Sequence, residues 1–262
     1  MSRAAAGSGD GPGTLQRGAL EKLLGSYPRQ RPPLPPAQRA IYVAEYKANR
    51  TGQNPIQRLA QAAESWMHRQ VARPPGGERL LEIGAGALNH LPYESAPTYD
   101  IVEPFTALYE DSPQRARVAR CFADIGELAT EPSYDRILSI AVLEHLEDLP
   151  TVIARSGRLL RSGGRFQAGI PSEGGFLWGL GWRCTTGLSY RLRTGLSYGM
   201  VMRHEHLSQA PEIVAVVRYF FEQVELRYFP LPHHHLSLYA YLEASHPIVE
   251  RCDAQLEARA HE

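Results

Sequence analysis

The sequence has almost no lysine, few cysteines and no long hydrophobic run. Lys22 and Lys47 are the only lysines among 28 basic residues, and 28 acidic residues balance the charge. A net charge of zero excludes a chain whose main task is unspecific electrostatic binding of nucleic acid. The strongest apolar stretch, residues 137–143, is too short to span a membrane.

The cysteines and the first residues indicate the cellular compartment. Cys121, Cys184 and Cys252 are odd in number and widely separated, which predicts reduced thiols rather than a disulfide framework or a zinc cluster. Residues 1–13 contain no apolar segment typical of a secretory signal. These features predict a cytoplasmic protein.

Charge is distributed unevenly along the chain. Residues 1–77 contain 11 basic and 4 acidic residues, and residues 78–150 contain 5 and 14. Residues 151–203 contain 8 and 1, and residues 204–262 contain 4 and 9. Such asymmetry predicts separate surfaces of opposite sign.

Composition and periodicity divide the chain into three parts. Residues 1–36 are rich in small residues and then in proline, which predicts a disordered and then extended N-terminal segment. Residues 37–77 predict a helical cap, because apolar residues recur there at helical spacing. Residues 78–262 predict the main domain, in which regular patterning lapses at about 172–209 in a lid-like insertion.

Short apolar strands alternate with helices throughout the main domain. We expect five strands ending in or near 83, 103, 125, 140 and 170, a helix at 149–160, and a helix at 210–221 followed by two strands at 223–229 and 236–243. This order predicts an α/β fold with a doubly wound, mostly parallel seven-stranded sheet. N-terminal helices and the insertion after the fifth strand complete the expected architecture.

A glycine turn with acidic residues around it is the main chemical signal. Gly84 and Gly86 follow the first strand, where glycine allows a sharp turn and close approach of a ligand. Glu103 closes the second strand, 21 residues after Glu82, where a carboxylate can accept hydrogen bonds from ribose hydroxyls. Asp124 ends the third strand, where its side chain could meet an adenine amino group or simply cap a helix.

Two classes of nucleotide cofactor fit this arrangement. A dinucleotide fingerprint requires a third glycine where this chain has Asn89, and Glu82 would lie close to the pyrophosphate. A negative charge there disfavours a dinucleotide and favours a ligand with ammonium and sulfonium charges. S-adenosylmethionine is such a ligand, and the acidic block at 78–150 points the same way.

With these motifs the chain resembles the class I S-adenosylmethionine-dependent methyltransferases, in particular type 11-like members. The matching segments lie in family order at family spacing: LLEIGAG (80–86), YDIVEP (99–104), ADIGEL (123–128), YDRILSIAVLEHLEDL (134–149) and LLRSGGRFQAGIPSEGG (159–175). The chain departs from the family at Leu88, where many members have a third glycine. LNHLPYES and IPSEGGFLWGL are loosely similar to members linked to surface-polysaccharide synthesis.

The resemblance implies a cofactor site and leaves the catalytic group open. It implies that S-adenosylmethionine binds to Glu82, Gly84, Ala85, Gly86, Glu103, Asp124, Ile125, Ser139, Ile140 and Ala141. Candidate general bases are His145, His204 and His206, each weighed against an ordinary hydrogen-bonding role. Some members bind a metal through an E-x-x-E-H segment, but Ala141 replaces the first carboxylate here, so no metal is expected.

The acceptor is the least determined part of this interpretation. The insertion combines Trp178, Trp182 and Tyr198 with Arg183 and Arg191, which suits a lid, a surface for a phosphorylated substrate, or a peripheral contact with lipid headgroups. We expect O-methylation of a small or glycan-like, anionic acceptor. The alternatives are an RNA methyltransferase, against which the lack of an RNA-binding domain argues, and a non-catalytic protein that binds S-adenosylmethionine.

Overall fold

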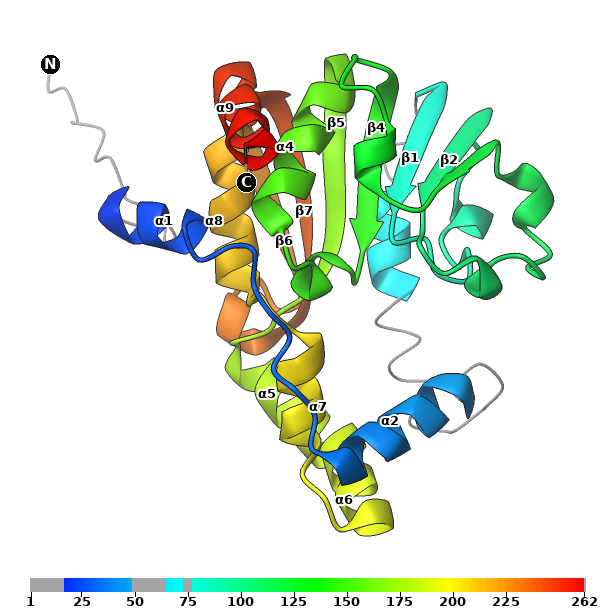
Figure 1. Cartoon of the computed structure of the whole chain (residues 1–262), viewed down its shortest axis with the longest axis vertical. Helices are drawn as coiled ribbons and strands as arrows, with labels where there is room; N and C mark the ends of the chain where they lie inside the picture. The colour runs from blue at the N-terminus through cyan, green and yellow to red at the C-terminus, as the bar shows by residue number, and fades with distance from the viewer. Residues whose placement is uncertain (1–16, 49–64, 73–76, 262) are drawn as a thin grey trace, which may run out of the picture.

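A seven-stranded sheet forms the centre of the computed structural model, which describes residues 17–48, 65–72 and 77–261 (Figure 1). Its strand order is β3-β2-β1-β4-β5-β7-β6. The strands are β1 (Arg79–Ile83), β2 (Thr98–Val102), β3 (Arg120–Phe122), β4 (Tyr134–Ile140), β5 (Leu160–Pro171), β6 (Phe221–Pro230) and β7 (Ser237–Pro247). β1 to β5 are parallel, and β7 runs antiparallel to both β5 and β6. The expected doubly wound, mostly parallel sheet is confirmed.

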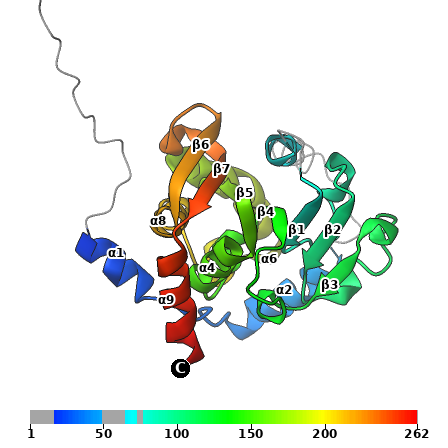
Figure 2. The same ribbon diagram turned by 90° about the horizontal axis from the view of Figure 1, so that it is seen from above.

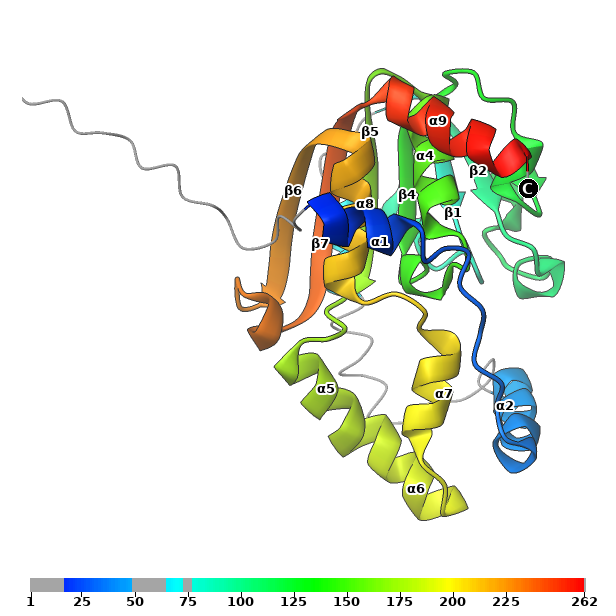
Figure 3. The ribbon, with the colours of Figure 1, turned by 60° about the vertical axis from the view of Figure 1, so that its left-hand side comes forward.

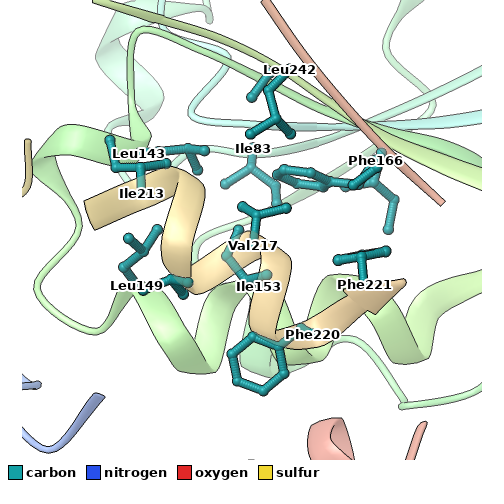
Figure 4. Close-up of a cluster of buried hydrophobic side chains, with 14 of the residues drawn as sticks. Ile83, Leu143, Leu149, Ile153, Phe166, Ile213, Val217, Phe220, Phe221 and Leu242 are labelled. Carbon is teal, nitrogen blue, oxygen red and sulfur yellow. The ribbon is translucent and has the colours of Figure 1, made fainter. Parts of the chain in front are cut away.

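Three helices, α4 (Leu149–Leu159), α8 (Ala210–Phe220) and α9 (Val249–Ala260), pack together and cover one part of the sheet (Figure 2). Asp148 begins α4 by accepting a hydrogen bond from the backbone of Thr151, and Glu212 forms a capping box at the start of α8. Between them and the sheet, Ile153, Phe166 and Val217 are fully buried (Figure 4). This apolar layer fixes the carboxyl ends of β4 and β5, where the candidate site lies.

The segments that join β1, β2 and β3 contain no α-helix among the described residues. They form short 3-10 turns instead: η1 (Leu91–Tyr93), η2 (Thr106–Leu108) and η3 (Arg115–Arg117). The expectation of helices between all strands is therefore wrong for this half of the sheet. Pro92 and Pro104 stand in these connections, and proline interrupts the backbone hydrogen bonds that a helix interior requires.

The N-terminal segment differs from its expected disorder. Helix α1 (Arg17–Leu24) places Leu20, Leu23 and Leu24 at helical spacing against the main core. After α1, Tyr27 hydroxyl lies 2.8 Å from Ser208 Oγ, and the Arg29 guanidinium donates 2.9 and 3.0 Å hydrogen bonds to Glu212. Helix α1 at 17–24 departs from the expected disordered and then proline-rich segment, whereas residues 25–35 form no helix, as expected of a proline-rich stretch. Residues 1–16 lie outside the described part of the chain.

The helical cap expected at 37–77 is described only in part. Helix α2 (Pro36–Ala48) begins at a proline, and a further helical segment covers 65–71. The apolar stripe at 56–63 and the proline pair at 74–75 lie outside the described residues.

The insertion after β5 is helical, in contrast to its expected irregularity. It forms α5 (Phe176–Trp182), the π-helical turn η6 (Arg183–Gly187), α6 (Leu188–Thr194) and α7 (Tyr198–Glu205). These elements extend from the sheet at the end nearest α2 (Figure 3). The glycines at 179, 181, 187, 195 and 199 hide the helical pattern in the sequence.

Candidate functional site

A cleft of about 560 Å³ opens at the carboxyl ends of β1, β2 and β4. This size is ordinary for a small-molecule site. Nearly all of the residues expected to bind the cofactor line it: Glu82, Gly84, Ala85, Gly86, Glu103, Asp124, Ile125, Ile140 and Ala141. Ser139 is buried beside the cleft and does not line it; its hydroxyl donates a 3.2 Å hydrogen bond to the Ile83 carbonyl.

The glycine turn after β1 adopts backbone conformations that favour glycine. Gly84 has φ of 72°, and a Cβ there would lie 2.4 Å from Val142 Cγ2. Gly86 has φ of 51°, but a Cβ there would meet no atom within 4 Å. Leu88, at the place of the missing third glycine, also has a positive φ of 65°, and its side chain is buried. The backbone of the turn therefore stays left-handed at Leu88, although this conformation is unfavourable for a residue with a side chain.

Glu103 connects this turn to the end of β2. One carboxylate oxygen accepts a 2.9 Å hydrogen bond from the Gly86 amide, and the other accepts 3.0 Å from the Phe105 amide. Each oxygen keeps a second lone pair that can accept a hydroxyl proton. The side chain is thus held in one orientation at the wall of the cleft, with unused acceptor capacity.

Glu82 lies buried at the inner wall of the cleft. Its carboxylate accepts a 2.6 Å hydrogen bond from the Tyr99 hydroxyl. Desolvation raises the pKa of Glu82 to about 8, and the nearby Glu94 and Glu103 add to the rise while the Tyr99 bond opposes it. Such a group gains most from a cationic partner, because a positive charge restores its ionised form.

Asp124 and Ile125 form the opposite end of the cleft. Asp124 Oδ1 accepts a 2.6 Å hydrogen bond from the Gly126 amide and so caps the short turn η4 (Ile125–Glu127). This geometry matches the capping alternative for Asp124, and the residue also lines the cleft. Its Oδ2 atom can still accept a hydrogen bond.

Of the three candidate histidines, only His145 lines the cleft. It ends the turn η5 (Leu143–His145), and its Nδ1 lies 2.8 Å from the Glu205 carbonyl oxygen. A carbonyl only accepts, so Nδ1 carries the proton and Nε2 of the neutral ring has a free lone pair. That nitrogen is suited to accept a proton from a bound molecule.

The other two histidines lie behind or away from this wall. His206 packs edge-on against His145 with ring centroids 4.8 Å apart, and its Nδ1 donates to the Glu173 carboxylate. His204 Nδ1 lies 2.8 Å from the Pro32 carbonyl oxygen, outside the cleft. The structure therefore brings His145 and His206 together and separates His204 from them.

Two further histidines in the cleft wall were missed in the sequence. His68 and His90 line the cleft, and their Nδ1 atoms lie 3.1 Å apart. His90 Nε2 lies 3.0 Å from Glu94, and burial lowers the pKa of His90. Glu94 in turn forms two hydrogen bonds of 2.8 and 2.9 Å with the buried Arg136. The motif LNHLPYES contained His90 and Glu94, but only the fold brings His68 to them.

Glu144 is another residue that the sequence did not indicate, and it lies next to His145. It is buried, one of its carboxylate oxygens has no hydrogen-bond partner, and the other lies 3.7 Å from His145 Nε2. Desolvation raises the pKa of Glu144 to about 7, with a smaller opposing effect of His145.

The insertion contributes little to the cleft. Of residues 172–209 only Glu205 lines it, opposite Arg31 from the proline-rich segment. Arg31 donates a 2.8 Å hydrogen bond to the His145 carbonyl. Within the described residues, no group of three or more histidine, cysteine or acidic side chains is placed to hold a metal ion.

Comparison with known proteins agrees with this geometry. Residues 56–176 match a family model described as a methyltransferase domain. None of the curated proteins searched matches the chain. A possible histamine N-methyltransferase from Thermotoga maritima has 17% identity and a TM-score of 0.54, covering 78% of this chain and 95% of its own.

Two other solved structures have the same fold. An O-methyltransferase family protein from Burkholderia thailandensis shares 16% identity, with a TM-score of 0.51, 87% of this chain covered and 68% of that chain. The N-methyltransferase NodS from Bradyrhizobium japonicum, bound to S-adenosyl-l-homocysteine, shares 15% identity, with a TM-score of 0.50 and coverage of 87% and 98%. The chain is therefore similar to methyltransferases over residues 56–176 and shares the fold of these solved structures.

Proposed function

We propose that the cleft binds S-adenosylmethionine through the residues that line it and that the chain methylates a hydroxyl oxygen of a small or glycan-like acceptor. The fit of the cofactor rests on the buried Glu82 carboxyl group, whose raised pKa calls for a cation, and on the open space above Gly86. Glu82 would face the ammonium group, Glu103 the ribose hydroxyls, and Asp124 with Ile125 the adenine. When bound, this cofactor supplies a methyl group activated by its sulfonium.

The observation that carries the hydroxyl acceptor is the fixed tautomer of His145. Its Nδ1 proton is held by the Glu205 carbonyl, which leaves Nε2 free at the cleft wall. We propose that Nε2 takes the proton of the acceptor hydroxyl as the oxygen attacks the methyl carbon. The edge contact of His206, whose ring is held by Glu173, would keep the His145 ring in place.

The acceptor would enter beside the ion pair of Arg31 and Glu205, whose charged atoms lie 4.0 Å apart. These side chains line the outer part of the cleft and come from opposite ends of the chain. An anionic group beside the acceptor hydroxyl would be attracted to Arg31. The loose similarity to polysaccharide-linked methyltransferases supports a glycan-like molecule.

Calorimetry with S-adenosylmethionine tests the cofactor site. We expect wild-type protein to bind and Glu103→Gln to bind at least about tenfold more weakly, because a neutral amide accepts ribose hydrogen bonds less strongly. Glu131→Gln, an exposed carboxylate outside the cleft, is the matched control. Wild-type protein that does not bind the cofactor would contradict the assignment.

Transfer of a labelled methyl group to nucleotide sugars, lipid-linked sugars and RNA tests the acceptor. We expect a sugar acceptor, with turnover in His145→Ala reduced by roughly a hundredfold, the usual contribution of a general base. His204→Ala, which lies outside the cleft, should keep full turnover. Methylation of RNA alone would replace the proposed acceptor, and binding without any transfer would indicate a non-catalytic protein.

A further inference from the structure

The four elements α5, η6, α6 and α7, residues 176–205, form an arm that extends from the carboxyl end of the sheet (Figure 3). The inner side of the arm is packed: Trp178 stacks edge-on against Tyr239 of β7, and Tyr190 is buried against Tyr198. The arm is therefore an ordered part of the fold.

The outer side of the arm exposes large apolar side chains. Phe176 is 67% exposed, Leu180 46%, Leu188 50% and Leu192 78%. These positions differ by multiples of four residues. Because one α-helical turn takes about 3.6 residues, side chains at this spacing point in gradually changing directions around the helix. The π-helical turn η6 widens one turn between Leu180 and Leu188 and so reduces this rotation. The four side chains consequently form one exposed apolar stripe.

The charged side chains of the arm are arginines, apart from Glu205, its last residue, which pairs with Arg31 at 4.0 Å. Residues 174–204 contain no aspartate or glutamate and four arginines: Arg183, Arg191, Arg193 and Arg203. Arg183, Arg191 and Arg203 are exposed and form no ion pair with any of the residues that the structure describes. Among the exposed arginines elsewhere, Arg17 and Arg161 have acidic partners, whereas Arg115 and Arg117 donate to backbone carbonyls. The arm therefore places three arginines without an acidic partner beside the apolar stripe.

A hollow of about 560 Å³ joins the two features. Its lining includes Trp182, Arg183, Leu188, Arg191 and Tyr198, and none of its lining residues is acidic. Two guanidinium groups can hold a phosphate, and the amphipathic rings of Trp and Tyr suit the boundary between water and hydrocarbon. Tyr198 and Trp182 lie with ring centroids 6.1 Å apart, which places both rings at this hollow.

We propose that the arm binds the surface of an anionic lipid bilayer, with the apolar stripe inserted among the headgroups and Arg183 and Arg191 bound to lipid phosphate. A face with exposed leucine and phenylalanine, arginine alone and no acid has the composition of an interfacial helix. Basic residues next to such a face are attracted to anionic lipids. No helix among the described residues is long and apolar enough to span a membrane, so this contact is peripheral.

The charge of this face also favours a lipid bilayer over a second copy of this chain as the binding partner. Two arms that met through the same face would bring arginines of like charge together with no acid between them. Only Glu205, the last residue of the arm, lines the cleft, so the exposed apolar stripe does not cover it. An anionic lipid surface complements both the charge and the apolar stripe.

Sedimentation with lipid vesicles tests this proposal without cofactor or acceptor. We expect wild-type protein to bind vesicles of equimolar phosphatidylcholine and phosphatidylglycerol and not to bind vesicles made only of phosphatidylcholine. Binding to the mixed vesicles should be weaker at high salt. The pair Phe176→Ser and Leu192→Ser, and separately the pair Arg183→Ala and Arg191→Ala, should each lower binding by about tenfold or more. Val249→Ser in α9 and Arg17→Ala in α1, exposed positions outside the arm, should bind like wild type.

Three outcomes would overturn the proposal. One is the absence of binding to either kind of vesicle by folded wild-type protein. Another is binding that the arm variants retain, which would place the contact elsewhere. The third is a lack of vesicle binding together with a dimer in analytical ultracentrifugation that Leu192→Ser converts to monomer. That result would mean that the stripe binds a second copy of this chain. Circular dichroism of each variant confirms that a loss of binding is not a loss of fold.

Discussion

Tyr99 donates a 2.6 Å hydrogen bond to Glu82, and both side chains are buried at the inner wall of the cofactor cleft. The two residues lie on neighbouring strands, β2 and β1. Burial raises the pKa of Glu82 to about 8 and raises that of Tyr99 well above its ordinary range. With no cation beside it, Glu82 is therefore mainly the neutral acid at pH 7.

The first prediction concerns cofactor binding and pH. An ammonium group beside Glu82 favours the carboxylate, so binding below pH 8 should release a proton, and affinity should rise with pH by up to about tenfold per unit. Calorimetry at pH 7 in two buffers of different ionisation enthalpy measures the released proton. Glu82→Gln should bind weakly with no release from this site. Equal proton release in wild type and variant would contradict the assignment.

A second prediction follows for the stability of the cofactor-free protein. The folded protein keeps a proton on Glu82 that the unfolded chain loses above its ordinary pKa of about 4.5. Glu82 should therefore make the free energy of unfolding fall as pH rises from about 4.5 to about 8, with no further change beyond. Urea denaturation across this range compares wild type with Glu82→Gln. The variant should lack this part of the slope, and an identical slope would show that Glu82 titrates normally.

A third prediction uses the two glycines of the turn. Gly84→Ala would place a Cβ 2.4 Å from Val142 Cγ2, so it should lower the free energy of unfolding by about 1–3 kcal/mol or more. Gly86→Ala places its Cβ in open space and should cost only about 1–2 kcal/mol of backbone strain. Gly86→Ala should instead weaken cofactor binding, because its methyl group enters the cleft. Denaturation and calorimetry on both variants separate the two effects, and unchanged binding by Gly86→Ala would contradict this placement.

A fourth prediction concerns the buried ion pair of Arg136 and Glu94. Arg136 also donates to Gln167 Oε1 and to the Val71 carbonyl, so it ties β4 to β5 and to the segment that carries His68. Arg136→Met would leave Glu94 without its buried cation and should cost about 3–5 kcal/mol. Arg161→Met removes a comparatively exposed ion pair with Asp135 and should cost less than about 1 kcal/mol. Similar losses in the two variants would contradict the structural role of Arg136.

A fifth prediction concerns the reduced cysteines. Desolvation raises the pKa of the buried Cys252 thiol to about 12, whereas Cys184 is exposed. Ellman titration of native protein should label Cys184 rapidly and Cys252 only after denaturation, because the thiolate is the reactive form. Cys184→Ser removes the fast phase and identifies it. Rapid labelling of Cys252 in folded protein would contradict its burial.

The sheet, and the grouping of the predicted residues around one cleft, followed from sequence because their signals are local. β4 runs from Tyr134 to Ile140, the range expected from its apolar run, and the capping residues of α8 mark its beginning. Glu82, Gly84 and Glu103 sit at strand ends, and parallel strands bring such ends to one edge. The helices of the arm were missed because seven glycines from 174 to 199 lower the helical signal.

The rest of the site depends on contacts between distant residues. His68 reaches His90 only because the segment 65–71 packs on the sheet, and Arg31 reaches His145 only because α1 docks on α8. The sequence pattern also did not identify α9, whose exposed face is strongly polar. Disorder was expected for residues 17–24, although three leucines at helical spacing would have indicated α1.

The position of Arg31 in the cleft wall has a consequence for any shortened form of this protein. A chain that began at residue 78 would keep all seven strands, yet it would lack Arg31 and His68 and with them part of the wall of the cleft. Its sheet could still fold around the same apolar layer while the cleft stood open to water on that side. The N-terminal region is therefore part of the cleft wall, and a boundary at residue 78 would separate side chains that line the same cleft.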